Sequence, residues 1–259
     1  MKRTMSAASF LFFLLLGCWI CVAQTPGRSP ERDPRAISAV EQALAALGGK
    51  NANLQVRTIV IRGTLRIEGE QAPSSFLWED DLSGRLPEFR KEILSADQAH
   101  VFVSGHGTPA HVTGGRHAQV GLQHALAVPP LNMPGLALAR ELKDQSYSFE
   151  LIGDNTGLIH VRTFWDVVSG SSFAQQDWYF DSNTHSPVRV EYFLPSTQRA
   201  GSAPASMEFS DFRLISGVAI PHKIVGHGPD QRSRTFTVTS VQTNVNIESA
   251  EFELKGGQQ

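Results

Sequence analysis

The stretch that decides the fold is Arg57–Glu68, with the sequence RTIVIRGTLRIE. Apolar residues at positions 59, 61, 65 and 67 alternate in it with polar residues at positions 58, 62, 64 and 66. A period of two residues is typical of a β-strand with one buried face, because successive side chains of a strand point to opposite sides. The stretch therefore predicts a long first strand that faces a core on one side.

Ten further runs along the chain have strand-like composition or alternation. They are Ser75–Leu82, Glu88–Leu94, His100–Ser104, Tyr147–Gly153, Leu158–Trp165, Asp177–Asp181, Val188–Phe193, Met207–Leu214, Val218–Val225 and Arg234–Thr243. Short turn-rich gaps such as Gly153–Asn155 and Ser216–Gly217 favour hairpins over crossover helices. We therefore predict a mainly β fold of the α+β class, with an antiparallel sheet of about 11 strands.

The composition is that of a folded domain. The 259 residues are 41% apolar, and 25 acidic against 23 basic residues give a formal net charge of −2. A chain this apolar can bury a core, which a disordered chain cannot do. Its near-neutral charge offers no basic surface for nucleic acid, so we expect no nucleic-acid partner.

The first 23 residues have the pattern of a secretory signal peptide. A short cationic head precedes an apolar run over residues 10–23, which is shorter than the roughly 20 residues needed to span a bilayer. Small residues near the end of the run predict cleavage after Ala23. A retained membrane anchor is one alternative. Another is acylation of Cys18, because the segment Leu15–Cys18 (LLGC) resembles a bacterial lipobox.

Both cysteines of the chain, Cys18 and Cys21, lie in this leader. Cleavage after Ala23 would leave no thiol, which excludes disulfides, thiolate metal sites and cysteine nucleophiles. Residues 24–32 are rich in proline, glycine and arginine and predict a flexible lead-in. We expect residues 33–259 to form a single domain.

Two regions depart from the strand pattern. Asp33 and Pro34 mark a helix start, and apolar residues recur at helical spacing until Gly48–Gly49, which predicts an amphipathic helix of about 14 residues. In the central stretch 117–143 we predict two short helices, Gln119–Val128 and Pro134–Lys143, separated by prolines.

The second of these helices has an apolar side formed by Leu136, Leu138 and Leu142, with the charged residues 140, 141 and 143 available for water. Two interpretations stay open. The helix covers the apolar face of the sheet, which is the commoner role, or it is a movable lid over a cavity.

The chain contains no pattern that predicts catalysis or metal binding. Five histidines lie within 25 residues, but their spacings of 6, 5, 6 and 7 do not suit zinc, whose ligands usually pair at shorter spacing beside a carboxylate or thiolate. These histidines are His100, His106, His111, His117 and His124. The run Gly105–Ala110 matches a dinucleotide fingerprint by letter, but Gly114–Gly115 would interrupt the required helix, so we interpret it as a glycine turn.

The sequence also lacks the Gly-x-Ser-x-Gly, Ser-x-x-Lys and His-Glu-x-x-His motifs. The adjacent acids at positions 79–81 lie on one predicted strand, where neighbouring side chains point to opposite faces and do not converge on one bond. We therefore expect a protein that is not an enzyme and that uses no cofactor and no metal.

Aromatic side chains gather on the predicted strands and share one face within a strand, as in the pairs Phe76/Trp78 and Trp178/Phe180. On a strongly curved sheet this face would line an apolar groove, whereas ordinary core packing explains the same pattern. The candidate ligand-binding residues are Phe76, Trp78, Trp165, Trp178, Phe180, Leu136, Leu138 and Leu142.

Three segments of the C-terminal half are similar to one family. They are Asp177–Asp181 with Ser186–Glu191 (DWYFD and SPVRVE), Phe209–Phe212 with Gly217–Ile224, and Thr237–Val241. Together they resemble the bacterial outer-membrane lipoprotein-sorting proteins of the LolA-like superfamily. The predicted first helix, which ends at Leu47–Gly49 before a long strand, is similar as well.

The resemblance implies an incomplete β-barrel, in which a curved antiparallel sheet carries helices that plug its apolar concave face. Proteins of this superfamily carry lipoprotein acyl chains or other lipids across the periplasm. A buried methylene contributes about 0.8 kcal/mol, so a groove lined by aromatic rings can hold an acyl chain without specific polar contacts.

By this resemblance we expect a periplasmic or envelope carrier or binding protein. Its partner would be a lipid or an acylated lipoprotein, and its membrane contact would be transient unless Cys18 is acylated. An envelope sensor or scaffold that uses the same fold to bind a protein partner is the alternative.

Overall fold

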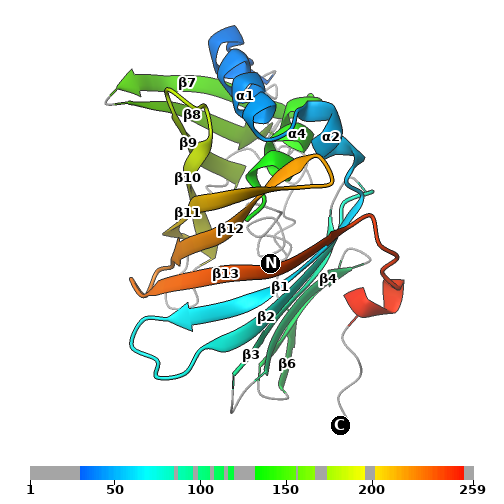
Figure 1. Ribbon diagram of the computed structural model, residues 1–259. Coiled ribbons are helices and arrows are strands. Elements are labelled where there is room, and N and C mark those ends of the chain that lie inside the picture. Colours follow the sequence, from blue (N-terminus) through cyan, green and yellow to red (C-terminus); the bar gives the residue numbers. More distant parts are fainter. Residues whose placement is uncertain are drawn as a thin grey trace, which may run out of the picture.

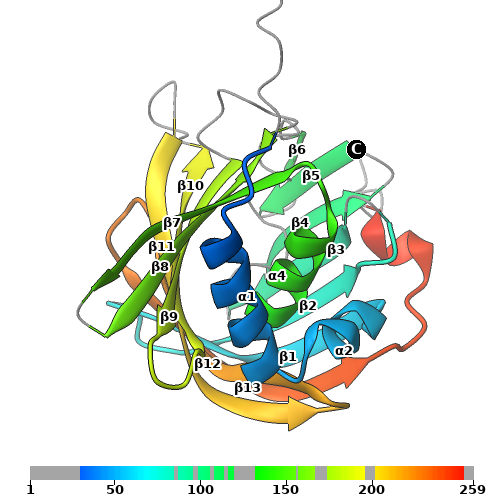
Figure 2. The same ribbon diagram turned by 90° about the horizontal axis from the view of Figure 1, so that it is seen from above.

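One curved antiparallel sheet forms the body of the protein (Figure 1). The computed structural model describes residues 30–84, 87–95, 99–105, 108–113, 116–119, 132–155, 157–166, 174–195 and 202–253. In these ranges thirteen strands belong to the sheet. The sheet bends into an incomplete barrel that holds helices inside its curve (Figures 1 and 2). The predicted fold class is confirmed.

The sheet consists of two meanders that meet in its middle. The first contains β1 (Thr58–Ile67), β2 (Ser74–Asp81), β3 (Glu88–Leu94), β4 (Ala99–Gly105), β5 (Thr108–Thr113) and β6 (Arg116–Gln119). The second contains β7 (Tyr147–Asn155), β8 (Leu158–Trp165), β9 (Gln175–Asp181), β10 (Pro187–Pro195), β11 (Ser202–Ile215), β12 (Val218–His227) and β13 (Ser233–Thr243). β1 pairs with β13, and β6 and β7 stand at the two ends of the strand order, so the sheet does not close within the described residues.

All eleven predicted strands are present, and β5 and β6 are additional. The central interruption, which we expected to begin at His117, therefore begins later, because Arg116–Gln119 pairs with β5. These two strands carry few large apolar residues, so their pairing depends on backbone hydrogen bonds that alternation does not reveal. Most of the predicted helix Gln119–Val128 lies outside the described residues, as do residues 1–23 with the predicted signal peptide.

The first predicted helix is confirmed as α1 (Pro34–Ala46). Asp33 caps it, because its Oδ1 accepts a hydrogen bond from the backbone N–H of Arg35 at 2.8 Å. The helix ends where Gly48 adopts a φ of 97°, and a side chain there would collide with the carbonyl oxygen of Gly217 in the turn between β11 and β12. The end of α1 is thereby fixed against β12.

The helices lie inside the curve of the sheet (Figure 2). α1 packs against β7 and β8, and α4 (Pro134–Lys143) packs against α1, β12 and the short α2 (Lys50–Gln55). The bounds of α4 are those predicted from the sequence. The 3-10 helix η3 (Ser249–Phe252) packs on the other side of the sheet, against β3 and β4.

The end of the predicted lead-in is attached to the sheet. The carbonyl oxygen of Glu31 accepts a hydrogen bond from the N–H of Phe149 at 2.7 Å, and the N–H of Asp33 donates to the carbonyl oxygen of Phe149 at 2.9 Å. Arg32 therefore forms a parallel bridge to the edge strand β7. The folded part of the chain includes Glu31 and Arg32, which we assigned to the lead-in, because their backbone groups complete this edge.

Candidate ligand-binding face

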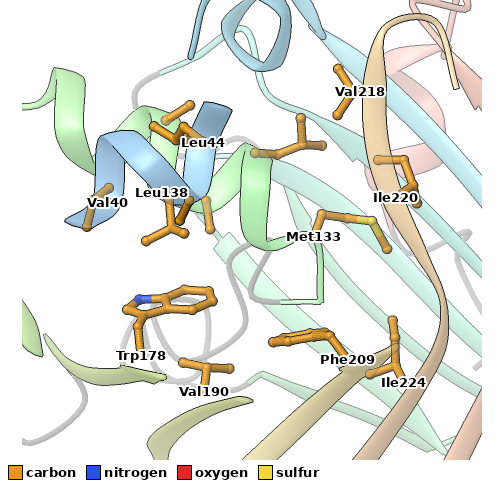
Figure 3. Packing of buried hydrophobic residues seen from close by; sticks show 14 of the residues in the cluster. Val40, Leu44, Met133, Leu138, Trp178, Val190, Phe209, Val218, Ile220 and Ile224 are labelled. Atoms are coloured by element: carbon orange, nitrogen blue, oxygen red, sulfur yellow. The ribbon is translucent and has the colours of Figure 1, made fainter. Parts of the chain in front are cut away.

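The concave face of the sheet and the helices inside it share one apolar core. Side chains from α1 and α4 point toward side chains from β9, β11 and β12 (Figure 3). Leu138 of α4 lies above Trp178, while Met133 lies near Phe209 and Ile220 in the same view. The alternation of the strands produces this arrangement, since one face of each strand points toward the helices.

The predicted aromatic pair Phe76 and Trp78 lies on this inner face, on β2. Their ring centroids are 4.4 Å apart, and Phe236 of β13 lies 4.9 Å from Trp78 and 5.4 Å from Phe76. Gly63 of β1 makes room for the cluster, because a Cβ there would lie 2.6 Å from the Phe76 ring. We call Phe76, Trp78 and Phe236 the aromatic platform.

The other predicted aromatic pair lies further round the sheet. Trp178 and Phe180 of β9 are both fully buried, and Trp178 donates a hydrogen bond from Nε1 to Oε1 of Gln176 at 3.1 Å. The α4 leucines Leu136, Leu138 and Leu142 are buried in the same cluster. The fold thus brings seven of the eight predicted residues together.

Trp165 is the exception. It lies at the end of β8, is partly exposed and stacks on Tyr147, with ring centroids 6.1 Å apart. Its Nε1 donates to Oγ of Ser146 at 2.9 Å. The residue has the strand position that we expected, but it lies outside the core cluster because the strand ends beyond the helices.

The seven clustered residues form a packed core in this structure and not an open groove. Each of them is at most 6% exposed, and buried residues of α1 and α4 belong to the same core cluster. An acyl chain can reach this face only if a covering element moves. Two roles were left open for α4. In this structure the helix covers the apolar face of the sheet, and its role as a movable lid stays a proposal.

Two arginines hold α4 in place. Arg140 of α4 donates to the carbonyl oxygens of Val56 at 2.7 Å and Leu136 at 3.1 Å. At the C-terminal end of the helix, Arg32 donates to the carbonyl oxygens of Leu142, Asp144 and Tyr147 at 2.9, 3.2 and 3.0 Å. Carbonyls at a helix C-terminus carry partial negative charge, so a cation there is favourable.

A carboxylate is buried next to the aromatic platform. Asp80 follows Phe76 and Trp78 on the inner face of β2 and is 2% exposed. Burial raises its pKa, and the charges of Lys91 on β3 and Arg140 on α4 oppose this rise. The Lys91 ammonium lies 5.9 Å from the Trp78 ring centroid, which places it on the same face. The Oδ2 atom of Asp80 accepts no hydrogen bond from the part of the chain that the structure describes.

A second buried carboxyl group lies under α4. Glu141 is 5% exposed, and burial raises its pKa to about 7. The neighbouring polar side chains of Thr163 on β8 and Gln176 on β9 act in the opposite direction. Its Oε2 has no partner among the described residues. The expectation that residues 140, 141 and 143 face water is therefore wrong for Glu141 and only partly right for Arg140, whereas Lys143 is exposed.

The sequence contained a signal for Asp80 that we did not use. The alternation that places Phe76 and Trp78 on one face also places Asp80 there, two residues further on. The sequence contains a weaker signal for the burial of Glu141. The helix α4 is short, and its buried surface is wider than the single apolar side that the spacing of its leucines indicates. Eight of its ten residues are buried, since both α1 and the sheet pack against it.

Among the described residues, no group of three or more His, Cys, Asp or Glu side chains gathers to hold a metal ion. Of the five clustered histidines, only His100 has a side chain among the described residues. Within the same ranges, no helix has the length and apolar character that crossing a membrane requires.

The outer face of the sheet carries a hollow of about 360 Å³ over β10, β11 and β12. Charged and apolar residues line it together: Leu158 of β8, and Val188, Arg189, Glu208, Phe209, Ser210, Lys223 and Val225. The side chain of Phe209 itself points into the core. Lys223 and Val225 alternate with the buried, inward-facing Ile224, so this hollow lies on the side away from the helices.

These features define a class of protein: an incomplete antiparallel barrel whose concave apolar face encloses helices. No protein-family model and no curated protein matches the sequence. Among solved structures, a DUF1329 family protein from Desulfovibrio piger is similar, with a TM-score of 0.54 and 13% identity over 85% of this chain and 98% of that chain. A LolA superfamily protein from Nitrosomonas europaea has a TM-score of 0.53 and 12% identity over 85% of this chain and 97% of that chain.

The chain has a LolA-like fold. The family resemblance of its C-terminal hairpins is thereby confirmed at the level of the fold. At 12–13% identity the likeness extends no further than the fold, because one architecture hosts many unrelated activities.

Proposed function

We propose that the protein is a periplasmic or envelope binding protein, or carrier, for the acyl chain of a lipid or a lipoprotein. The aromatic platform and the apolar face of α4 are the surfaces that would contact the chain. The observation that carries the proposal is an open half-barrel whose apolar concave face is covered by a short helix and not closed by strands.

The way in which α4 is held supports a role as a movable plug. The helix has ten residues, and its polar contacts in the described ranges include those of Arg140, of the guanidinium of Arg32 and of Glu141. Beneath it, Oε2 of Glu141 is buried without a partner in the described ranges. An unsatisfied buried polar atom costs about 1–3 kcal/mol, which lowers the free energy needed to move the helix away.

A reversible tether tests whether α4 must move. An ideal Cβ at Gly135, near the start of α4, lies 3.1 Å from Cγ of Asn53 on α2. The sulfur of Asn53→Cys would take the place of that Cγ, so Asn53→Cys with Gly135→Cys suits a disulfide. Changing Cys18 and Cys21 to Ser leaves this pair as the only thiols of the chain.

We expect the oxidised double variant to take up a fluorescent fatty-acid probe much more slowly than the same protein after reduction. The reduced form is the matched control, because it carries the same two substitutions. Equal uptake in the two forms would contradict a role for α4 as the plug.

The binding role itself is tested on the protein purified under native conditions. Mass spectrometry should detect a bound lipid, or the emptied protein should take up the probe. A chain that contains no lipid and takes up no probe would refute the proposed function.

The alternative is an envelope sensor or scaffold that binds a protein partner. The outer-face hollow favours it, because charged Arg189, Glu208 and Lys223 lie there beside apolar side chains, as is common in protein interfaces. This alternative predicts that a defined envelope protein is captured by the native chain and that its capture is lost in Lys223→Glu, while no stoichiometric lipid is found.

A further inference from the structure

Asp80 occupies a place on the inner face where an apolar residue would be expected. It is 2% exposed and continues the row formed by Phe76 and Trp78 along β2. From Phe76 to Asp80 the strand advances by roughly 13 Å. A chain lying on the aromatic platform along β2 would therefore place one end beside this carboxylate.

Contacts other than Asp80 also position the two cations whose charges act on it. Arg140 takes its position from the carbonyl oxygens of Val56 and Leu136, and Lys91 lies over the rings of Trp78 and Phe89. Removal of one member of a buried ionic group leaves the other charges uncompensated, so Asp80→Leu is expected to cost stability. The Oδ2 atom of Asp80 is a buried acceptor that lacks a partner in the described residues, and a ligand or water can supply the missing donor.

The charges around Asp80 restrict the donor. An anionic head group would face the carboxylate itself, and an ammonium would face both Lys91 and Arg140, whose charges act on Asp80. Like charges at close range in a buried site repel strongly because the local dielectric constant is low. A neutral donor avoids both penalties and satisfies the unpaired oxygen.

We propose that Asp80 receives the polar end of the ligand, and that this end is a neutral hydrogen-bond donor, a hydroxyl or an amide N–H, carried by an acyl chain. The inference rests on the proposed function, since it needs an acyl chain on the aromatic platform. The inference specifies the ligand class: an acyl chain whose polar end is a neutral hydrogen-bond donor.

The experiment measures separately the binding of an acyl chain to the apolar face and the recognition of its polar end by Asp80. Methyl cis-parinarate, a fluorescent acyl ester without a hydrogen-bond donor, reports binding to the face. Its displacement is then measured with 1-monopalmitoylglycerol (hydroxyl donor), palmitamide (amide donor), methyl palmitate (no donor) and palmitate (anion). The full chain is compared with Asp80→Leu, with Asp80→Asn and with Asp154→Leu, an exposed control on β7.

In the unaltered chain we expect the better of the two donor ligands to displace the probe at about ten-fold lower concentration than methyl palmitate, as one hydrogen bond to a charged group would provide. Comparison of 1-monopalmitoylglycerol with palmitamide shows whether the preferred donor is a hydroxyl or an amide. In Asp80→Leu the preference should vanish while the probe still binds, and Asp154→Leu should keep it. Asp80→Asn, which conserves the shape, should reduce the preference even if Asp80→Leu fails to fold.

Three outcomes would overturn the inference alone: the probe binds but all ligands compete equally, the preference survives both Asp80 substitutions, or palmitate competes best. If the unaltered chain binds neither the probe nor any competitor, the proposed function fails and this inference fails with it.

Discussion

Glu141→Gln should remove a pH dependence of stability that the buried carboxyl of α4 imposes. The pKa of Glu141 is raised from its ordinary value of 4.5 to about 7, chiefly by burial. The folded state therefore binds this proton more tightly than the unfolded state does. The stabilisation is complete below pH 4.5 and is lost as the pH rises to 7.

The magnitude follows from the two pKa values. One pKa unit corresponds to about 1.4 kcal/mol, so a rise from 4.5 to about 7 amounts to roughly 3 kcal/mol of unfolding free energy. The neutral amide of Gln has nearly the same shape and does not titrate. We expect the variant to match the unaltered protein at pH 5 to within about 1 kcal/mol and to exceed it by roughly 3 kcal/mol at pH 8.

The assay is urea unfolding followed by tryptophan fluorescence at pH 5, 6, 7 and 8. Only the difference between the two proteins is interpreted, because other groups titrate in both. Glu41→Gln, an exposed position on α1, is the matched control and should show no pH-dependent difference. If Glu141→Gln and the unaltered protein have parallel pH profiles, the carboxyl is not desolvated under α4 and the reasoning is refuted.

Two further substitutions test the contacts that position the inner face. Arg32→Ala should lower the free energy of unfolding by about 2 kcal/mol, because it removes the donors to three carbonyl oxygens at the end of α4. Urea unfolding measures this loss, and Arg66→Ala, at an exposed position, is the control. A loss no larger than that of the control would contradict the prediction. Gly63→Ala should cost about 1–3 kcal/mol, because its Cβ would collide with the carbonyl oxygen of Thr237 and with the Phe76 ring. A Cβ at Gly226 meets only atoms at 3.9 Å, so Gly226→Ala should unfold at nearly the unaltered urea concentration. Equal midpoints for the two variants would argue against the close packing on β1.

The secondary structure was largely predictable because its signals are local. Alternation identified β1 and ten other strands, and the Asp33–Pro34 start identified α1. The bounds of α4 followed from Pro134 and the apolar spacing. The strands β5 and β6 were missed because their pairing is made by backbone hydrogen bonds to β4 and to each other, which leave little trace in side-chain pattern.

The candidate face was predictable only in part. The sequence indicated which aromatic and leucine side chains turn inward, and seven of these eight residues share one core. It did not indicate that Trp165 lies beyond the helices, or that α4 is covered on more than one side so that Glu141 is buried.

The sequence by itself determined the strand and helix segments and the inward side of each strand, because these depend on neighbouring residues. The tertiary structure decided which segments meet: the pairing of β1 with β13, the bridge from Arg32 to β7, and the burial of Asp80 beside Arg140. Burial and charge environment arise from contacts between residues far apart in the chain. A local pattern therefore cannot report whether a polar side chain meets water or a core.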